Sequence, residues 1–259
     1  MAHLDGRLTG RTALVTGASR GIGQAIALRL ARDGALVGVH YGHDEPAAKE
    51  TVTRIVDGGG RAFAVRAELA AFDAADVLWS GFDAALAELA APPGVDILVN
   101  NAGISSSSDL VGTGVDEFDR VFAVNVRAPF FVIQGALGRL RDGGRVINIS
   151  SGATRIAAPS MVTYAMSKSA LNTLSYTLAA QLGGRGITVN SVSPGIVDVD
   201  SNAAWLRDDP EQLAVWGSFS AFNRVGQPAD IADVVAFVAS DEARWITGQT
   251  VDATGGAHL

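Results

Sequence analysis

The stretch "TALVTGASRGIGQAIALRL" (residues 12–30) decides the fold, because a strand, a glycine-rich turn and a helix follow one another in it. Three glycines, Gly17, Gly21 and Gly23, come directly after the apolar run "TALVT". Glycine permits a tight turn and lets backbone N–H groups approach a pyrophosphate, and the positive end of the following helix dipole favours the same anion. An ordinary strand-to-helix turn would also suit three glycines. Their place after the first strand, with a helix behind them, favours nucleotide binding.

The alternation of strand and helix continues along the chain. Runs typical of strands recur as "ALVGVH", "AFAVRA", "VDILVN", "RVINIS", "ITVNSV" and "QTVDA". Helix-length patterns separate the early strands at residues 21–33, 45–56 and 73–89. Such alternation indicates right-handed βαβ units and a parallel sheet. We therefore predict a single doubly wound α/β domain over residues 1–259, with about seven parallel strands and helices on both faces.

One segment breaks this rhythm. Residues 196–227, called the lid segment below, lack a strand pattern but contain the aromatic residues Trp205, Trp216, Phe219 and Phe222. We predict an insertion that lies over the end of the sheet and covers the substrate, because loops on a rigid scaffold commonly carry specificity. The aromatic residues would bind a bulky apolar substrate, with Met161 beside them, or would pack the lid segment against its own base.

Composition excludes several classes of function. The chain has 259 residues, a formal net charge of -7, a pI of about 5.0 and no cysteine. An acidic chain without a long basic run suits neither nucleic acid nor an anionic membrane, and thiol catalysis is excluded. The N-terminus lacks a signal-peptide pattern, so we expect a soluble, cytoplasmic protein. The spacing of the four histidines does not suit metal ligands: they are His3, His40, His43 and His258. We therefore predict no catalytic metal.

Several short motifs together resemble the short-chain dehydrogenase/reductase family, and most closely its β-ketoacyl-carrier-protein reductase-like ketoreductases. They are "TGASRGIG", "NNAG" at residues 100–103, Asn125, the serines Ser150 and Ser151, "YAMSK" from Tyr164 to Lys168, and "SPG" at residues 193–195. They occur in the family's order from about residue 9 to the C-terminus. The resemblance implies a Rossmann-type fold and an oxidoreductase that acts on a small-molecule carbonyl or alcohol with a nicotinamide cofactor.

Tyr164 and Lys168 form the candidate acid/base pair. Residues four apart share one face of a helix. A free tyrosine has a pKa near 10, and a nearby ammonium should lower it. The resemblance implies that Tyr164 is the general acid in reduction, that Ser151 hydrogen-bonds the substrate oxygen, and that Lys168 also binds the nicotinamide ribose. It further implies that Asn125 holds a water in a proton relay, and Pro129, four residues later, would free a backbone carbonyl beside it.

Cofactor preference depends on the end of the second strand, "GVHYGHDE". Tyr41 stands where NAD-preferring relatives carry an acid, while Asp44 and Glu45 better suit the start of the next helix. Arg20 matches a position where NADP-preferring relatives are basic, and an arginine can bind a 2′-phosphate through two charge-assisted bonds. His43 would add to that contact. We therefore favour NADP(H) over NAD(H). The alternative is that Arg20 is only a solvated surface charge.

The resemblance assigns further cofactor contacts. Ser19 and Ile22 complete the glycine loop, and Glu68 and Leu69 follow the third strand near the adenine. Asn101 would contact the adenine-side ribose and Gly103 the same crevice, whereas Asn100 would brace the strands. Pro194 and Gly195 would surround the nicotinamide. Relatives often carry threonine four residues after this glycine, but here Val199 stands there, and the Val197 amide would replace its contact with the carboxamide.

Assembly and activity each leave alternatives. The patterns "FDRVFAVNVRAPFFVIQGAL" and "MVTYAMSKSALNTLSYTLAAQL" have apolar residues on several helix faces and need burial beyond one sheet. The resemblance implies that they pair across a two-fold axis, and that a second interface at the last strand makes a homotetramer, with a dimer as the alternative. The alternatives to a ketoreductase are an NAD-dependent alcohol or hydroxysteroid-type dehydrogenase, a catalytically silent nucleotide sensor, and an epimerase or dehydratase.

Overall fold

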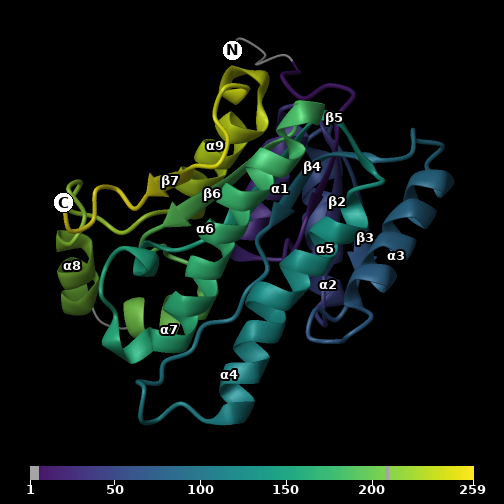
Figure 1. Cartoon of the computed structure of the whole chain (residues 1–259). Helices are drawn as coiled ribbons and strands as arrows, with labels where there is room; N and C mark the ends of the chain where they lie inside the picture. The colour runs from purple at the N-terminus through teal and green to yellow at the C-terminus, as the bar shows by residue number, and fades with distance from the viewer. Residues whose placement is uncertain (1–5, 208–209) are drawn as a thin grey trace.

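The computed structural model describes residues 6–207 and 210–259. Its centre is one sheet of seven parallel strands in the order β3-β2-β1-β4-β5-β6-β7 (Figure 1). The strands are β1 Thr12–Val15, β2 Leu36–Tyr41, β3 Arg61–Arg66, β4 Val95–Asn100, β5 Leu140–Ile149, β6 Thr188–Pro194 and β7 Thr250–Ala253. The predicted doubly wound parallel sheet is confirmed.

Most element bounds agree with the sequence patterns, and β5 is the exception. It begins at Leu140, five residues before "RVINIS". Leu140 pairs with Val95 ahead of a register shift, and Gly143 in the shifted stretch has a φ of 74°. A polar, glycine-containing stretch of this kind gives no apolar pattern, so its pairing depends on the neighbouring strand.

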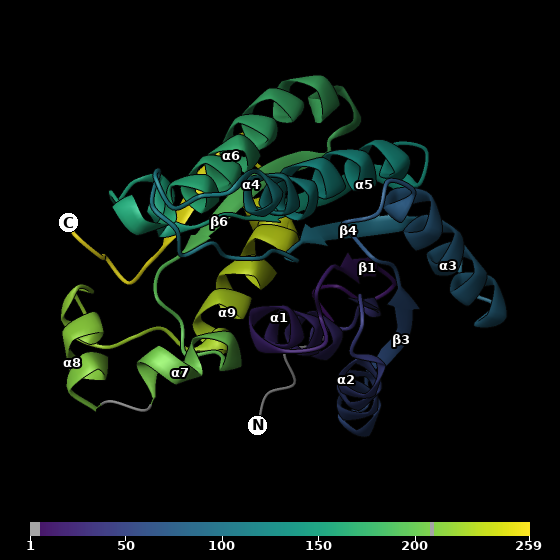
Figure 2. The ribbon, with the colours of Figure 1, turned by 90° about the horizontal axis from the view of Figure 1, so that it is seen from below.

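Helices cover both faces of the sheet, as predicted (Figure 2). One layer contains α1 Gly21–Arg32, α2 Glu45–Asp57 and α9 Pro228–Ala239. The other contains α3 Ala74–Glu88, α4 Val115–Phe122, α5 Ala128–Ala136 and α6 Val162–Leu182. The predicted start of α2 is confirmed, because the Asp44 side chain accepts a hydrogen bond from the Ala47 N–H (3.1 Å) and caps the helix.

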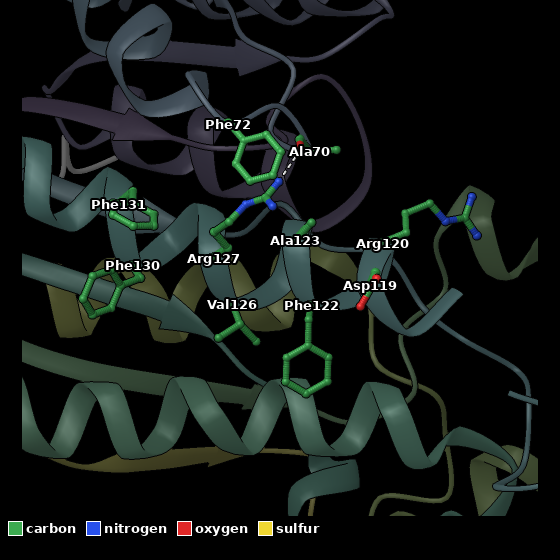
Figure 3. Close-up of a pocket in the computed structure, with 10 residues that line it drawn as sticks. All are labelled: Ala70, Phe72, Asp119, Arg120, Phe122, Ala123, Val126, Arg127, Phe130 and Phe131. Atoms are coloured by element: carbon green, nitrogen blue, oxygen red, sulfur yellow. Dashed lines mark hydrogen bonds between the residues drawn. The ribbon is translucent and has the colours of Figure 1, made fainter. Parts of the chain in front are cut away.

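The outer surface of α4 and α5 is hollowed and apolar. A cavity of about 720 Å³ lies there, lined by Ala70, Phe72, Asp119, Arg120, Phe122, Ala123, Val126, Arg127, Phe130 and Phe131 (Figure 3). Phe72, Phe130 and Phe131 are exposed, and the Arg127 guanidinium stacks over the Phe72 ring at 4.2 Å. Folding therefore leaves an apolar helix surface open on this side of the molecule.

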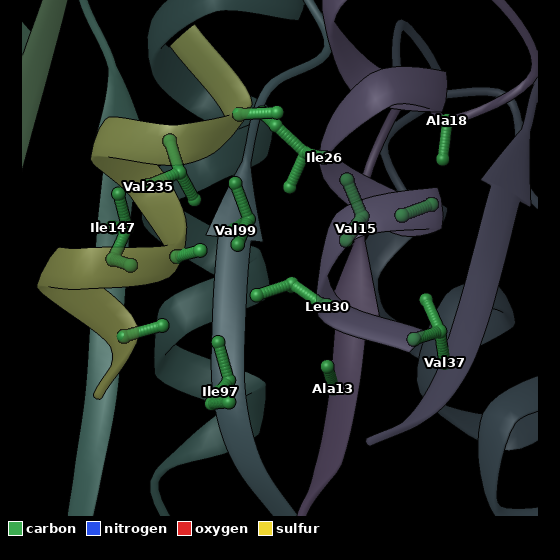
Figure 4. Close-up of a cluster of buried hydrophobic side chains, with 14 of the residues drawn as sticks. Ala13, Val15, Ala18, Ile26, Leu30, Val37, Ile97, Val99, Ile147 and Val235 are labelled. Atoms are coloured by element: carbon green, nitrogen blue, oxygen red, sulfur yellow. The ribbon is translucent and has the colours of Figure 1, made fainter. Parts of the chain in front are cut away.

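Two apolar cores lie on either side of the sheet. The first packs α1 and α9 against the strands, where Ile26, Leu30 and Val235 meet Val99 and Ile147 (Figure 4). The second packs α3, α5 and α6 against the opposite face around the fully buried Trp79 and Phe82. Strands covered on both faces explain the nearly continuous apolar runs in the sequence.

The lid segment is built from short helices beside the C-terminus (Figure 1). They are a 3₁₀ turn at Asp200–Asn202, α7 Ala203–Leu206 and α8 Pro210–Ser218, while residues 208–209 lie outside the described part. Its two ends meet, because Gly226 N–H donates to Ile196 O (2.8 Å) and Asp198 N–H donates to Gly226 O (2.9 Å). The segment is thus a closed excursion from the end of β6. Across residues 6–207 and 210–259, no helix has the length and apolar character to span a membrane.

Candidate active site

The strand order reverses between β1 and β4, and this reversal opens a crevice at the carboxyl ends of the strands. Gly17 follows β1 there, and Asn101 and Gly103 follow β4. Parallel strands all end at one edge, so segments distant in sequence converge at this crevice. The predicted nucleotide loop and the "NNAG" motif therefore lie side by side.

The glycine loop is compact because its glycines lie against other backbone. Gly17 and Gly21 have φ values of 62° and 58°, which favour glycine. A Cβ on Gly23 would lie 2.1 Å from the Gly17 oxygen, so no larger residue fits without a shift. Helix α1 begins at Gly21, and the N–H groups of its first turn have no acceptor within the helix. These orphan donors fit a pyrophosphate.

Asn101 clamps this loop. Its Nδ2 donates to the Thr16 carbonyl (2.8 Å) and to the Gly17 carbonyl (3.0 Å). In return, the Thr16 hydroxyl accepts from the Asn101 and Ala102 N–H groups (3.0 Å each). Both hydrogens of the Asn101 amide nitrogen are thus used by the loop, and the predicted ribose contact of Asn101 stays a prediction for its oxygen atoms. The role of Thr16 was not predicted from the sequence, although this threonine directly precedes the first glycine of the loop.

A chain of buried polar side chains joins β4 to β6. Asn100 donates to Asn148 on β5 (2.8 Å), Asn148 donates to Ser175 on α6 (2.8 Å), and Ser175 lies 2.9 Å from the Ser191 hydroxyl. The predicted bracing role of Asn100 is confirmed. Buried polar groups must be paired, so this chain fixes the strand ends that carry the site.

The residues predicted to contact the adenosine half of the cofactor differ in their burial. The Tyr41 side chain belongs to the first core, and Leu69 belongs to the second. Glu68 is exposed, accepts a hydrogen bond from the Ala70 N–H (3.2 Å) and pairs with His43. Arg20 is exposed and makes no ion pair within the described ranges. Only the backbone of Tyr41 and Leu69 can therefore face a ligand, whereas Arg20 keeps a free guanidinium.

Tyr164, Ser151 and Lys168 converge as predicted. Ser151 lies close enough to Tyr164 to lower the pKa of its phenol, and the Ser151 hydroxyl accepts a hydrogen bond from the Ala153 N–H (3.2 Å). Lys168 lies one turn further along α6, is buried, and donates from Nζ to the Ile149 carbonyl at the end of β5 (2.8 Å). A Cβ on Gly103 would lie 3.0 Å from this Nζ and 3.2 Å from the Asn125 Oδ1. Lys168 and Asn125 thus lie beside Gly103, Tyr164 lies next to Lys168, and Ser151 lies next to Tyr164.

The pKa of Tyr164 differs from the prediction. Burial raises it above 10, and the hydrogen bond from Ser151 only partly opposes this rise. The Lys168 Nζ, predicted to lower it, donates to the Ile149 carbonyl and lies 5.7 Å from the centre of the Tyr164 ring. Burial also lowers the pKa of Lys168 to about 8. A neutral phenol that keeps its proton suits a proton donor.

Asn125 lies in a π-helical turn, Ala123–Arg127, between α4 and α5. Its Oδ1 accepts from the Ile104 N–H (2.9 Å), and its Nδ2 donates to the Ile104 carbonyl (2.9 Å) and to the Ser167 hydroxyl (3.0 Å). Pro129 has no N–H to meet the Asn125 carbonyl four residues earlier. In this π-helical turn, however, the Ala128 N–H bonds the Ala123 carbonyl five residues earlier, so the freed carbonyl beside Asn125 stays a prediction. Ser167, which also bonds the Tyr164 carbonyl (2.7 Å), was missed by sequence analysis.

The segment after β6 borders the crevice. A Cβ on Gly195 would meet Thr254 backbone at 3.0 Å, so Thr254 requires glycine there, and the sequence gave no sign of Thr254. The Val199 side chain reaches the glycine loop, with its Cγ1 3.4 Å from a Cβ placed on Gly21. The Val197 carbonyl accepts from Asn202 (2.9 Å), but its N–H has no partner in the described ranges. That amide stays available to a ligand.

The lid aromatics pack on one another. Trp205 and Trp216 meet edge to face with their centroids 5.5 Å apart, Trp216 meets Phe219 at 5.3 Å, and Phe219 meets the His258 ring at 4.7 Å. Trp205 and Phe222 nevertheless stay exposed. Both expected roles of these aromatics are thus compatible with the structure. His3 lies outside the described residues, and no acidic or histidine cluster in the described ranges has the form of a metal site.

Comparisons with known proteins agree with this geometry. The model of the family described as enoyl-(acyl carrier protein) reductase matches residues 17–258. Versicolorin reductase stcU of Emericella nidulans is 39% identical over 263 residues, covering 97% of each chain. A solved angucycline C-6 ketoreductase, LanV with bound NADP, is 50% identical with a TM-score of 0.93, covering 97% of this chain and 96% of LanV. LugOII, a reductase described as catalysing keto-reduction at C1 during lugdunomycin biosynthesis, is 50% identical with a TM-score of 0.94, covering 98% and 100%.

Proposed function

The chain belongs to the short-chain dehydrogenase/reductase family of oxidoreductases, and we propose that it is an NADP(H)-dependent ketoreductase. The observation that carries the proposal is that Ser151, Tyr164 and buried Lys168 come together next to a glycine loop with free N–H donors. Relatives named as ketoreductases, one of them with bound NADP, support both the reaction and the cofactor.

In this proposal the residues hold the cofactor in the crevice at the strand ends. The first-turn N–H groups of α1 bind the pyrophosphate, and Arg20 binds the 2′-phosphate. Lys168 bonds the nicotinamide ribose, and the Val197 N–H bonds the carboxamide. Buried Tyr41, in place of an acid, leaves no carboxylate at the end of β2 to repel the 2′-phosphate.

NADPH, when bound, supplies the hydride that reduces the carbonyl carbon. Ser151 and Tyr164 hydrogen-bond the carbonyl oxygen and orient it. Tyr164 donates its phenolic proton to this oxygen as negative charge develops there. Its raised pKa keeps the proton in place until that moment. Asn125 holds the segment after β4 against α6, and a water held beside it would return a proton toward Lys168.

The substrate is, in this proposal, a bulky apolar ketone of the polyketide or other secondary-metabolite type. Trp205 and Phe222 offer exposed aromatic surface on the lid segment, and Met161 immediately precedes α6, the helix of Tyr164. Versicolorin and angucycline, the names attached to the reductase relatives, support a polycyclic substrate.

The test is oxidation of NADPH and NADH by the purified protein over a panel of ketones, from small β-keto esters to polycyclic aromatics. We expect turnover with NADPH that is highest for a polycyclic ketone and absent in Tyr164→Phe. A preference for NADH, or for oxidising alcohols, would indicate the dehydrogenase alternative. Binding of NADPH without turnover of any carbonyl or alcohol would contradict the proposal and indicate a nucleotide sensor.

We also propose that the protein is a homotetramer. The apolar cavity on α4 and α5 (Figure 3) needs a cover, and a second copy of the same surface would bury Phe130 and Phe131. The second contact is proposed at β7, the edge strand, beside exposed Trp245. Light scattering after gel filtration tests this. Phe130→Asp should disrupt the contact through α4 and α5 and produce a smaller species. Trp245→Ser should disrupt only the contact at β7, so the two variants distinguish the two contacts.

A further inference from the structure

His40 is a buried ionisable side chain that the proposed chemistry does not use. It lies in β2, beside Tyr41, and is only 2% exposed. Its Nδ1 accepts a hydrogen bond from the Gly17 N–H in the glycine loop (3.0 Å). Its Nε2 lies 3.0 Å from the Ala67 carbonyl, one residue before Glu68. One imidazole thus connects two segments that border the adenosine half of the crevice.

The two partners determine which ring nitrogen carries the proton. A backbone N–H only donates and a backbone carbonyl only accepts, so Nδ1 must be bare and Nε2 must carry hydrogen. Burial lowers the pKa of His40 to about 4, and the opposing effects of the Ala67 carbonyl and Glu68 are smaller. The ring is therefore neutral and held in a single tautomer at neutral pH.

The contact matters because it completes the support of one peptide group. The Gly17 carbonyl accepts a hydrogen bond from Asn101, and the Gly17 N–H donates to His40. Gly17 also adopts a φ of 62° and packs against Ala102. The peptide that begins the nucleotide loop is thus held from β4 on one side and from β2 on the other.

We propose that His40 is a positioning residue for the dinucleotide, acting through the Gly17 N–H to hold the glycine loop in its binding conformation. This inference rests on the proposed function, since it takes the crevice to bind NADP(H). A loop held before binding does not lose conformational entropy on binding, so affinity rises without any contact between His40 and the cofactor. The second bond, to Ala67, fixes the segment that leads to Glu68 in the same way.

A matched pair of variants tests the acceptor role. In His40→Asn the amide oxygen branches from Cγ as Nδ1 does and can still accept from Gly17, whereas His40→Leu has a similar shape without an acceptor. The probe is NADPH, titrated by fluorescence, together with steady-state kinetics and thermal unfolding. We expect His40→Leu to raise the Kd of NADPH about five- to tenfold, with the loss in KM rather than kcat, and His40→Asn to recover most of it.

Several outcomes would overturn the inference. A folded His40→Leu with wild-type affinity would do so, as would equal losses of affinity in both variants that follow their thermal stability. If His40→Leu does not fold, ¹⁵N spectra of the wild-type ring decide, because a charged ring or an Nδ1–H tautomer near pH 7 contradicts the argument. Wild-type protein that binds neither NADPH nor NADH would instead refute the proposed function, and the ring spectra would still report the tautomer.

Discussion

Acidification should destabilise this protein through His40, by an amount that the structure allows us to calculate. The pKa of this ring is about 4 in the folded chain and 6.5 without burial. Below pH 6.5 the unfolded chain therefore binds a proton that the folded chain refuses, so the free energy of unfolding falls as the pH falls toward 4. From pH 7.5 to pH 5 the loss from this one group is about 2 kcal/mol.

The sign depends on burial outweighing the neighbouring charge. The hydrogen bond to the Ala67 carbonyl and, to a smaller extent, the charge of Glu68 act to raise the pKa of His40. The other charged groups on β3, α2 and α3 are turned to solvent or paired. Asp83 pairs with Arg139, and the remaining ones are exposed: Arg61, Arg66, Glu45, Lys49, Glu50, Arg54, Asp57, Asp76 and Glu88. Desolvation of the charged ring is thus the dominant effect.

The assay is urea unfolding of the wild type and His40→Asn at one protein concentration, at pH 7.5 and pH 5. Other titrating groups are common to both proteins, so the difference between their free energies of unfolding isolates His40. We expect the wild type to lose about 2 kcal/mol relative to His40→Asn over this range. A difference that stays constant to within about 0.5 kcal/mol, near the resolution of such comparisons, would refute the reasoning.

Three further predictions concern other parts of the crevice. Tyr164→Phe should lower kcat by about 10²- to 10⁴-fold and leave the Kd of NADPH nearly unchanged, whereas Lys168→Ala should damage both, as steady-state kinetics and fluorescence titration will show. Gly23→Ala places a Cβ 2.1 Å from the Gly17 oxygen and should therefore weaken NADPH binding at least about tenfold in a fluorescence titration. Unchanged affinity would mean that the loop does not hold the pyrophosphate. Asn148→Leu leaves the buried Asn100 amide without its side-chain partner and leaves Ser175 with Ser191 alone, and should destabilise the fold by about 3 kcal/mol in urea unfolding. A loss below about 1 kcal/mol would show that the polar chain is dispensable.

Local patterns in the sequence were sufficient for the architecture and for most site positions. Apolar strand runs, helical periods and the glycine turn are local signals, so six of the seven parallel strands and the first three helices were predicted within a residue or two, and only the start of β5 was missed by five residues. Ser151, Tyr164 and Lys168 were also predictable, because "NISS" and "YAMSK" place them at a strand end and on a helix. The structure confirms that these elements converge, and it confirms the bracing role of Asn100.

Tertiary structure decided how each polar group is used. The amide nitrogen of Asn101 donates to the glycine loop, Lys168 donates to the Ile149 carbonyl, and burial raises the pKa of Tyr164. Desolvation is a property of everything packed around a group, so no motif reveals that burial raises the pKa of Tyr164. Likewise, His40 was one histidine among four until the fold placed the Gly17 N–H and the Ala67 carbonyl on either side of its ring. Sequence determines which chemical groups are near a strand end, but partners from distant segments and the exclusion of water determine their protonation and their hydrogen bonds.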